Sequence, residues 1–128
     1  MWDLPGDPLG HAVGFSNANA MEIIVAHLAA SGRRNLAFVG ASEGGDLRGA
    51  ERRAGAIAAA EKLGLPPVTV LDAGAAPVSM RHGARLAAGL GSDLMRFDAL
   101  MCVSDPVAFG VLSECIRLGI DVPDQLAV

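Results

Sequence analysis

Short apolar segments alternate with longer amphipathic ones along most of the chain, and Gly or Pro residues separate them. The short segments are continuous runs of Val, Leu, Ala and Phe, without the alternating polar residues of a half-exposed strand. Continuous runs of this kind are typical of parallel strands that are covered on both faces. They predict strands at 12–15, 36–39, 68–71, 100–103 and 126–128.

Four helices are predicted between these strands, from apolar residues spaced three and four positions apart. They span 17–31, 46–63, 79–90 and 105–118. Asn17 is the expected N-cap of the first, and Asp105, followed by Pro106, is that of the fourth. The inward faces of the second and third are expected to consist of small or apolar side chains, namely Ala50, Ala54, Ile57 and Ala58, and Met80, Ala84, Ala87 and Ala88.

The regular alternation of strand and helix predicts an α/β fold, a three-layer open parallel sheet with helices on both faces. The 128 residues suffice for one domain with a real core. In such sheets, ligands bind in the crevice at the carboxyl ends of the strands. Binding residues are therefore expected in the loops at that edge.

Composition and charge exclude several classes of protein. Hydrophobic residues make up 52% and charged residues 19%, which excludes a disordered chain, and the net charge of −4 indicates no nucleic-acid surface. The two cysteines, Cys102 and Cys115, are expected to be reduced core thiols. Because there is no signal-peptide pattern and no long apolar stretch, we expect a cytoplasmic protein without a membrane partner.

The loop at 40–46 contains a G-x-S-x-G pattern centred on Ser42, as in the nucleophile turn of hydrolases. Further glycines delay the following helix, and His82, the only later histidine, lies within a predicted helix. The loop also lacks the glycine spacing of dinucleotide sites, and the only lysine, Lys62, is too distant for a phosphate-binding loop. No His, Cys, Asp and Glu spacing indicates a metal, so we expect neither enzyme, cofactor nor metal.

Arginines follow this loop on the second predicted helix. Arg48 and Arg53 are interpreted as a solvated face. Arg52 could instead present its planar fork to hydroxyls or a carboxylate in the crevice. Ser104 and Asp105 follow the fourth strand, where the serine could satisfy the loop or contact a ligand. Asp105 could cap the helix, contact a ligand, or do both, because a carboxylate has two oxygens.

Several phrases of the sequence occur together in one known family. They are Val-Gly-Phe-Ser-Asn at 13–17, Ser-Gly-Arg-Arg-Asn at 31–35, Arg-Arg-Ala-Gly at 52–55, Cys-Val-Ser-Asp-Pro at 102–106 and Leu-Gly-Ile-Asp-Val-Pro at 118–123. In order and spacing, from about residue 11 to 128, the chain resembles the sensor domain of the LacI/GalR family of bacterial transcription repressors. Residues 2–5 and 13–17 are most similar to repressors of gluconate utilisation.

The resemblance implies one lobe of a two-lobed, periplasmic-binding-protein-like type I fold that holds an effector between its lobes. Residues 1–16 would be the tail of the missing first lobe, and 17–128 the second lobe, truncated at its C-terminal end. Residues 1–15 are expected to be poorly ordered or paired with another chain. The effector would be a small sugar or sugar acid, gluconate-like in the closest subgroup. Operator DNA would bind only through a missing N-terminal domain.

The resemblance also implies roles for individual residues. Arg52, Ser104 and Asp105 match effector-binding positions, although the family usually has Asn where this chain has Ser104, and Ser42 and Val78 match lining positions. The helix after Asp105 would lie at a homodimer interface. A second apolar stripe formed by Phe109, Leu112 and Ile116 suits that role, and a central core helix is the other interpretation.

The sequence thus favours the effector-sensing part of a ligand-responsive transcriptional repressor, which acts by binding and not by catalysis. Two alternatives share the fold class. One is the periplasmic sugar-binding component of a transporter, and the other is a small Rossmann-like enzyme. Fold alone does not separate the three, because function depends on the site.

Overall fold

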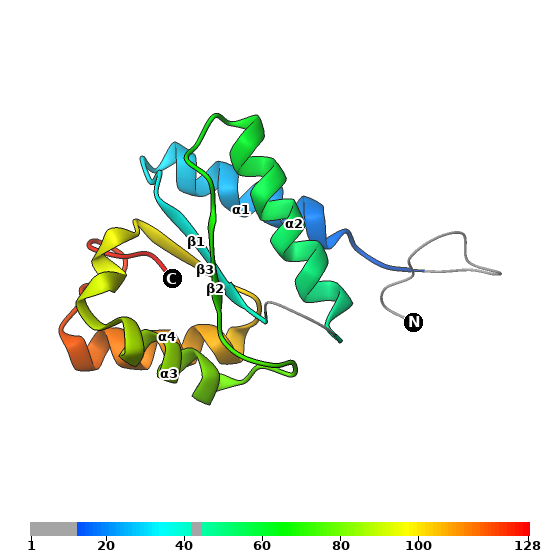
Figure 1. Cartoon of the computed structure of the whole chain (residues 1–128). Coiled ribbons are helices and arrows are strands. Elements are labelled where there is room, and N and C mark those ends of the chain that lie inside the picture. The colour runs from blue at the N-terminus through cyan, green and yellow to red at the C-terminus, as the bar shows by residue number, and fades with distance from the viewer. Residues whose placement is uncertain (1–12, 42–44) are drawn as a thin grey trace.

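Three parallel strands form the central sheet in the order β2-β1-β3 (Figure 1). They are β1 (Leu36–Gly40), β2 (Thr69–Asp72) and β3 (Ala99–Cys102). The structure is a computed structural model that describes residues 13–41 and 45–128. The middle strand, β1, is buried along its whole length, which accounts for its continuous apolar sequence.

Two helices cover each face of the sheet, so the predicted three-layer α/β fold is confirmed (Figure 1). The helices α1 (Asn17–Ala30) and α2 (Leu47–Lys62) pack together on one face, and α3 (Met80–Leu90) and α4 (Asp105–Leu118) pack on the other. A short 3-10 helix, η1 (Gly91–Arg96), leads into β3. The hydrophobic core lies between these layers, and its largest fully buried side chains include Phe38, Leu36 and Leu94.

Glycines allow the helices of each pair to approach closely. A Cβ atom on Gly55 of α2 would lie 2.6 Å from the Cα of Ala18 in α1. Between α3 and α4, a Cβ on Gly83 would overlap the Val107 carbonyl, and one on Gly110 would overlap that of Met80. Helix backbones therefore touch where larger side chains would hold them apart.

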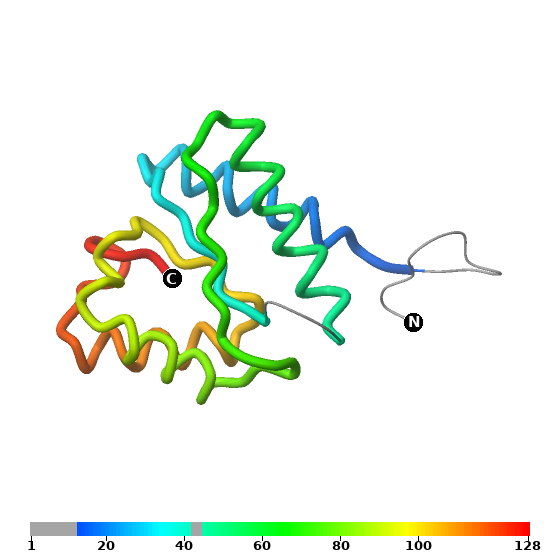
Figure 2. Tube along the Cα trace, in the orientation of Figure 1, coloured from blue at the N-terminus to red at the C-terminus, as the bar shows by residue number. Residues whose placement is uncertain are grey.

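The structure corrects the predictions for both ends of the sheet. Residues 13–15 form no strand, and Val13 is 80% exposed; Figure 2 shows this segment leading away from the sheet. At the other end, 126–128 forms only a single parallel bridge, between Ala127 and Ala99. Residue 12 lies outside the described residues, and the described part of this run, 13–15, is exposed and pairs with no strand.

Two N-caps lie one residue earlier than predicted. Ser16, not Asn17, caps α1, and its hydroxyl oxygen accepts a hydrogen bond from the Asn19 amide at 3.1 Å. Ser104, not Asp105, holds the N-cap position of α4. In each helix, the residue predicted as the N-cap is instead the first helical residue, so its side chain can make contacts other than capping the helix.

The inward faces of two helices also differ from the prediction. Helix α2 buries Gly49, Gly55, Ala56, Ala59 and Ala60, whereas Ala50, Ala54 and Ala58 are exposed. Helix α3 buries Ala87 as predicted but also Gly83, and Met80 and Ala88 are exposed. Alanine periodicity misled the prediction because glycines, which carry no hydrophobic side chain, mark the closest contacts.

One hydrogen-bonded cluster fixes the start of β1 next to the start of β3. The Asp98 carboxylate accepts hydrogen bonds from the backbone amides of Arg34 and Asn35, each at 2.7 Å. The Arg33 side chain donates to the carbonyls of Asp98 at 3.1 Å and Pro123 at 2.6 Å. The two backbone amides lower the pKa of Asp98 because they stabilise its charged form.

Candidate functional site

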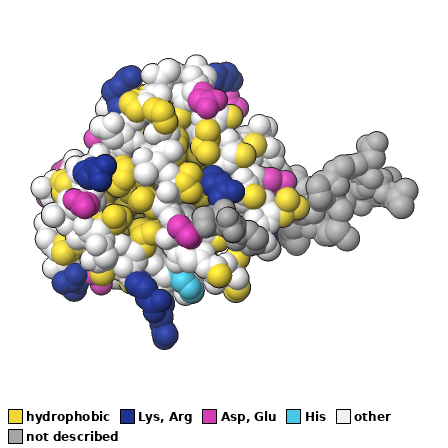
Figure 3. All heavy atoms as spheres, viewed as in Figure 1, with side chains coloured by type: hydrophobic (Ala, Val, Ile, Leu, Met, Phe, Trp, Pro, Cys, Tyr) yellow, Lys and Arg dark blue, Asp and Glu magenta, His cyan; other side chains and the backbone are white. Residues whose placement is uncertain are grey.

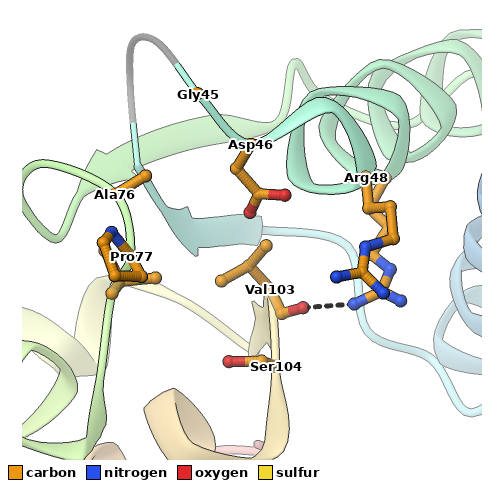
Figure 4. A pocket seen from close by; sticks show the side chains of 9 residues that line it. Gly45, Asp46, Arg48, Ala76, Pro77, Val103 and Ser104 are labelled. Atoms are coloured by element: carbon orange, nitrogen blue, oxygen red, sulfur yellow. Dashed lines mark hydrogen bonds between the residues drawn. The ribbon is translucent and has the colours of Figure 1, made fainter.

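A cavity of about 460 Å³ lies where the loops leave the carboxyl ends of the strands. Its walls come from the start of α2, the loop before α3 and the turn after β3, which supply Gly45, Asp46, Arg48, Arg52, Ala76, Pro77, Val78, Val103 and Ser104. Figure 4 shows Ala76 and Pro77 on one side and Arg48 on the other, with Asp46, Val103 and Ser104 between them. This is the edge at which open α/β sheets bind ligands.

Arg52 is half-buried in this wall and is held at two points. Its Nε donates to Oδ1 of Asn17 at 2.9 Å, and its Nη1 donates to the carbonyl oxygen of Val103 at 2.6 Å, the bond drawn in Figure 4. The first bond joins α2 to α1, and the second joins α2 to the end of β3. The guanidinium is thus fixed at the cavity before any ligand arrives.

Asn17 is buried, with 1% of its surface exposed. Its Nδ2 donates to Oε2 of Glu51 at 2.8 Å, so both ends of the amide have charged partners. Among the described residues, every buried side-chain polar atom has a hydrogen-bond partner. A role for Asn17 beyond capping the helix could not be predicted from the sequence, because its partners lie 34 and 35 residues away.

The structure brings three of the five predicted effector positions to this cavity, namely Arg52, Val78 and Ser104. Ser42 lies outside the described residues. Asp105 does not line the cavity, and its side chain is exposed at the start of α4. Asp46 and Arg48, which the sequence analysis took as a helix start and a solvated face, do line it.

Asp46 also organises the wall from which Arg52 projects. It caps α2 through its Oδ1, which accepts a hydrogen bond from the Gly49 amide at 2.9 Å. A Cβ on Gly49 would overlap the Asp46 carboxylate. The glycine therefore lets the capping carboxylate fold back over the helix N-terminus, where the positive end of the helix dipole favours negative charge.

Ser104 and Asp105 border a second hollow, which runs along β3 between α1 and α4 and has a volume of about 600 Å³. Its other lining residues are mostly apolar and include Ile24, Leu100 and Ala108.

The opposite edge of the sheet, formed by β2, is also partly open. There β2 leaves Val70 partly exposed, and Figure 3 shows hydrophobic side chains gathered across the middle of that face.

Neither thiol has the character of a catalytic nucleophile. Both are free, as expected, and burial raises the pKa of Cys102 to about 12 and also raises that of Cys115.

His82 is hydrogen-bonded to Ser79 at the start of α3, where its Nδ1 accepts from the Ser79 amide at 3.1 Å. Within 13–41 and 45–128, no group of three His, Cys, Asp or Glu side chains could hold a metal ion.

The outer face of α4 is open. Phe109 and Ile116 are 63% and 79% exposed, and Leu112 is half-buried between them. On the inner face, Val111 and Cys115 are fully buried. Within the described residues, this stripe is therefore exposed and does not pack into the core, which favours an interface over a central core helix. In the described part of the chain, no helix is long and apolar enough to cross a membrane.

Comparison with known proteins places these features in a family. The periplasmic binding protein-like domain family matches residues 25–128. The chain is 35% identical over 130 residues to the HTH-type transcriptional regulator GntR of Pseudomonas aeruginosa, and 32% identical over 117 residues to that of Escherichia coli. These alignments cover 100% and 91% of this chain, but 37% and 34% of the relatives. The chain thus spans about a third of their length.

Solved structures give the same result. A LacI family transcriptional regulator from Silicibacter pomeroyi superposes with a TM-score of 0.85 at 38% identity, over 99% of this chain and 47% of that one. The transcription regulator GntR from Chromobacterium violaceum superposes with a TM-score of 0.74 at 33% identity, over 90% of this chain and 42% of that one. The three-layer α/β architecture predicted from the sequence is therefore the one found in these solved transcriptional regulators.

Proposed function

This chain belongs to the periplasmic binding protein-like family, in the form found in LacI/GalR transcriptional regulators, and we propose that its strand-end cavity binds a small-molecule effector. The chain would be the effector-sensing portion of a ligand-responsive repressor. Residues 17–128 would form one lobe of a two-lobed sensor, and 13–16 would lead from the other lobe. The two GntR relatives and the LacI family structure reported above are transcriptional regulators, which supports a regulator over a transporter component.

One observation carries the proposal: Arg52 is held rigidly in the cavity wall without using all its donors. A guanidinium has five N–H groups, and the described residues accept hydrogen bonds from two of its nitrogens. Ser104, a second cavity residue, has a hydroxyl that does not cap α4 and has no partner among the described residues. A fixed cation beside a free hydroxyl suits a ligand that carries both a carboxylate and hydroxyl groups.

The effector class is therefore a sugar acid or a related polyhydroxy carboxylate. Arg48 and Arg52 outnumber Asp46, the one carboxylate in the described lining of the cavity, so the lining has a net positive charge, which favours an anion over a neutral sugar. In LacI-type sensing, such a ligand acts by favouring one closure state of the two lobes, and its effect is limited by its differential affinity for the two states. DNA binding would belong to another part of the regulator, because this chain has a net charge of −4.

The test is a titration of the purified, isotope-labelled chain with D-gluconate, followed by amide NMR shifts, with neutral D-glucitol as the matched ligand. A single lobe supplies half of a clamp, so we expect weak, millimolar binding with shifts around Arg52 and Ser104. Arg52→Ala should abolish these shifts. Arg85→Ala, which removes an exposed arginine of α3, should leave them unchanged.

Three results would contradict the proposal. They are shifts that map away from the cavity, equal responses to gluconate and glucitol, and no response to either ligand in the chain and in the longer regulator of which it would form part. Saturable micromolar binding by this chain alone would contradict the two-lobe part of the proposal, because one wall would then suffice.

The same family relationship supports a homodimer through α4. The stripe formed by Phe109, Leu112 and Ile116 has no covering element among the described residues. Large apolar side chains gathered on one helix face are costly to leave in water and are typical of a protein interface. A second copy of the chain is the partner proposed for this face.

A further inference from the structure

We propose that Asn17 is a positioning residue for Arg52, and that it decides which edge of the guanidinium faces the cavity. The inference rests on the proposed role of Arg52 in effector binding, but it concerns a residue that touches the ligand only through the arginine. Asn17 is the first residue of α1 and Arg52 lies in α2, so the contact joins two helices across 35 residues of sequence.

The amide of Asn17 has one acceptor end and one donor end, and the structure uses each for a different charged group. Oδ1 accepts from Nε of Arg52 at 2.9 Å, and Nδ2 donates to Oε2 of Glu51 at 2.8 Å. Because Asn17 is almost completely buried, water cannot replace either partner without opening the helix pair. Hydrogen bonds to charged groups in such surroundings are stronger than neutral ones. The amide is therefore locked in one orientation.

This orientation limits how Arg52 can bind an anion. A guanidinium grips a carboxylate with two parallel N–H groups, either from Nε and one terminal nitrogen or from the two terminal nitrogens. With Nε bound to Asn17, the first edge cannot engage both oxygens. Nη1 also donates to Val103 but carries a second hydrogen, and Nη2 has no partner in the described chain. The terminal edge is the part left for a ligand.

The packing of α1 on α2 explains how a short side chain can reach so far along the sequence. Gly55 lies against the backbone of Ala18, and this close approach brings Asn17 beside Glu51 and Arg52. An aspartate at position 17 would keep the acceptor for Nε but would place a second carboxylate against Glu51. Only a residue with both a donor and an acceptor satisfies this pair of neighbours.

The first experiment measures hydrogen exchange of the Arg52 Nε–H by NMR on the purified chain, which needs no ligand. In the original chain this proton should exchange at least about tenfold more slowly than that of the exposed Arg85. Asn17→Ala should remove the protection. Asn19→Ala is the matched control, because this exposed asparagine contributes only its backbone amide to the Ser16 cap. Equal exchange at Arg52 and Arg85, or protection that survives Asn17→Ala, would overturn the proposal.

Exchanging donor and acceptor between positions 17 and 51 tests whether the hydrogen-bond geometry, and not only the stability of the fold, protects the Arg52 Nε–H. Asn17→Asp alone should weaken the protection, because two carboxylates then meet. Asn17→Asp combined with Glu51→Gln should restore it, since the glutamine amide can donate to the new aspartate. A double variant that folds, by its amide spectrum, but shows no restored protection would contradict the assigned hydrogen bonds.

The gluconate titration then connects the positioning to binding. Asn17→Ala should weaken gluconate binding about tenfold, the loss expected for one hydrogen bond to a charged group. Asn19→Ala, the matched control, should leave the affinity for gluconate unchanged, because the Asn19 side chain does not contact Arg52. An equal loss of affinity in Asn17→Ala and Asn19→Ala would contradict the positioning role. If neither the original chain nor the longer regulator binds gluconate, the effector proposal fails, while the exchange measurements still decide whether Asn17 fixes the guanidinium.

Discussion

Gly55 of α2 lies directly against Ala18 of α1, where a Cβ on the glycine would be 2.6 Å from the alanine Cα and 2.9 Å from its carbonyl oxygen. Backbone meets backbone at this point, so no side chain can move aside to make room. Ala18 directly follows Asn17 in α1, and Gly55 lies three residues after Arg52 in α2. The candidate binding arginine thus depends on a helix crossing that only glycine permits.

Replacing Gly55 with alanine should therefore separate α1 from α2. We expect a loss of about 1–3 kcal/mol in the free energy of unfolding, the usual cost of overpacking, together with faster exchange of the Arg52 Nε–H. Urea unfolding and the NMR experiment measure the two effects. Gly89→Ala is the matched control, because nothing lies within 4 Å of its added Cβ. It should stabilise α3 by up to about 1 kcal/mol. Similar losses in both variants would refute the crossing as the cause.

Charge on the outer face of α4 should prevent self-association. Phe109→Glu and Ile116→Glu each place a carboxylate in the proposed dimer interface and should weaken dimerisation at least about tenfold, since burying an unpaired charge is costly. Sedimentation velocity over a concentration series measures this. Met95→Glu, at an exposed apolar residue of η1, is the control. A monomeric starting protein at every concentration would remove the basis for this interface in the chain alone.

Asp98 should make the fold sensitive to acid. Its pKa is lowered in the folded state by the Asn35 and Arg34 amides, so the carboxylate contributes stability above its unfolded pKa of about 3.9. That contribution is lost as the pH falls through the lower, folded pKa. Asp98→Asn should lower the thermal midpoint at pH 7, and the difference from the original chain should shrink below about pH 4. A difference that stays constant from pH 7 to pH 3 would contradict this account.

The start of α3 should depend on His82 and Ser79. The ring Nδ1 accepts from the Ser79 amide and lies 2.9 Å from the Ser79 hydroxyl oxygen. His82→Ala should cost about 1 kcal/mol in the free energy of unfolding, as for loss of a helix cap. His27→Ala, at a histidine in the last turn of α1, is the comparison. If His27→Ala costs as much as His82→Ala, the hydrogen bonds to Ser79 are not what stabilises the helix start.

The fold was predictable because its signal is local. The buried run at β1 and the Pro and Gly residues that bound α4 indicate their elements without knowledge of distant parts of the chain. The α/β class follows from the order of such elements. What the sequence could not show is which face a helix buries when alanine surrounds it, as in α2, where glycines decide the contact.

The candidate site was predictable only in part, for a similar reason. Ser104 follows β3 directly and Arg52 lies on the helix after β1, and both carry a side chain that suits a ligand at the strand ends. Asn17 and Asp46 were not predicted to have a further role, because an Asn or Asp at the start of a helix is explained by capping alone. Their further roles depend on which helix packs beside which, and that is a property of the folded chain.

The two thiols give the molecule reporters of its own motion. Cys102 ends β3 and Cys115 lies on the buried side of α4, and burial keeps both protonated at neutral pH. Cys115 is fully buried and can react with an alkylating reagent only while the helical layer is open, whereas Cys102 is half-buried and lines the hollow beside β3. The labelling rate of Cys115 would therefore report the opening of the helical layer, with Cys102 as the more accessible reference.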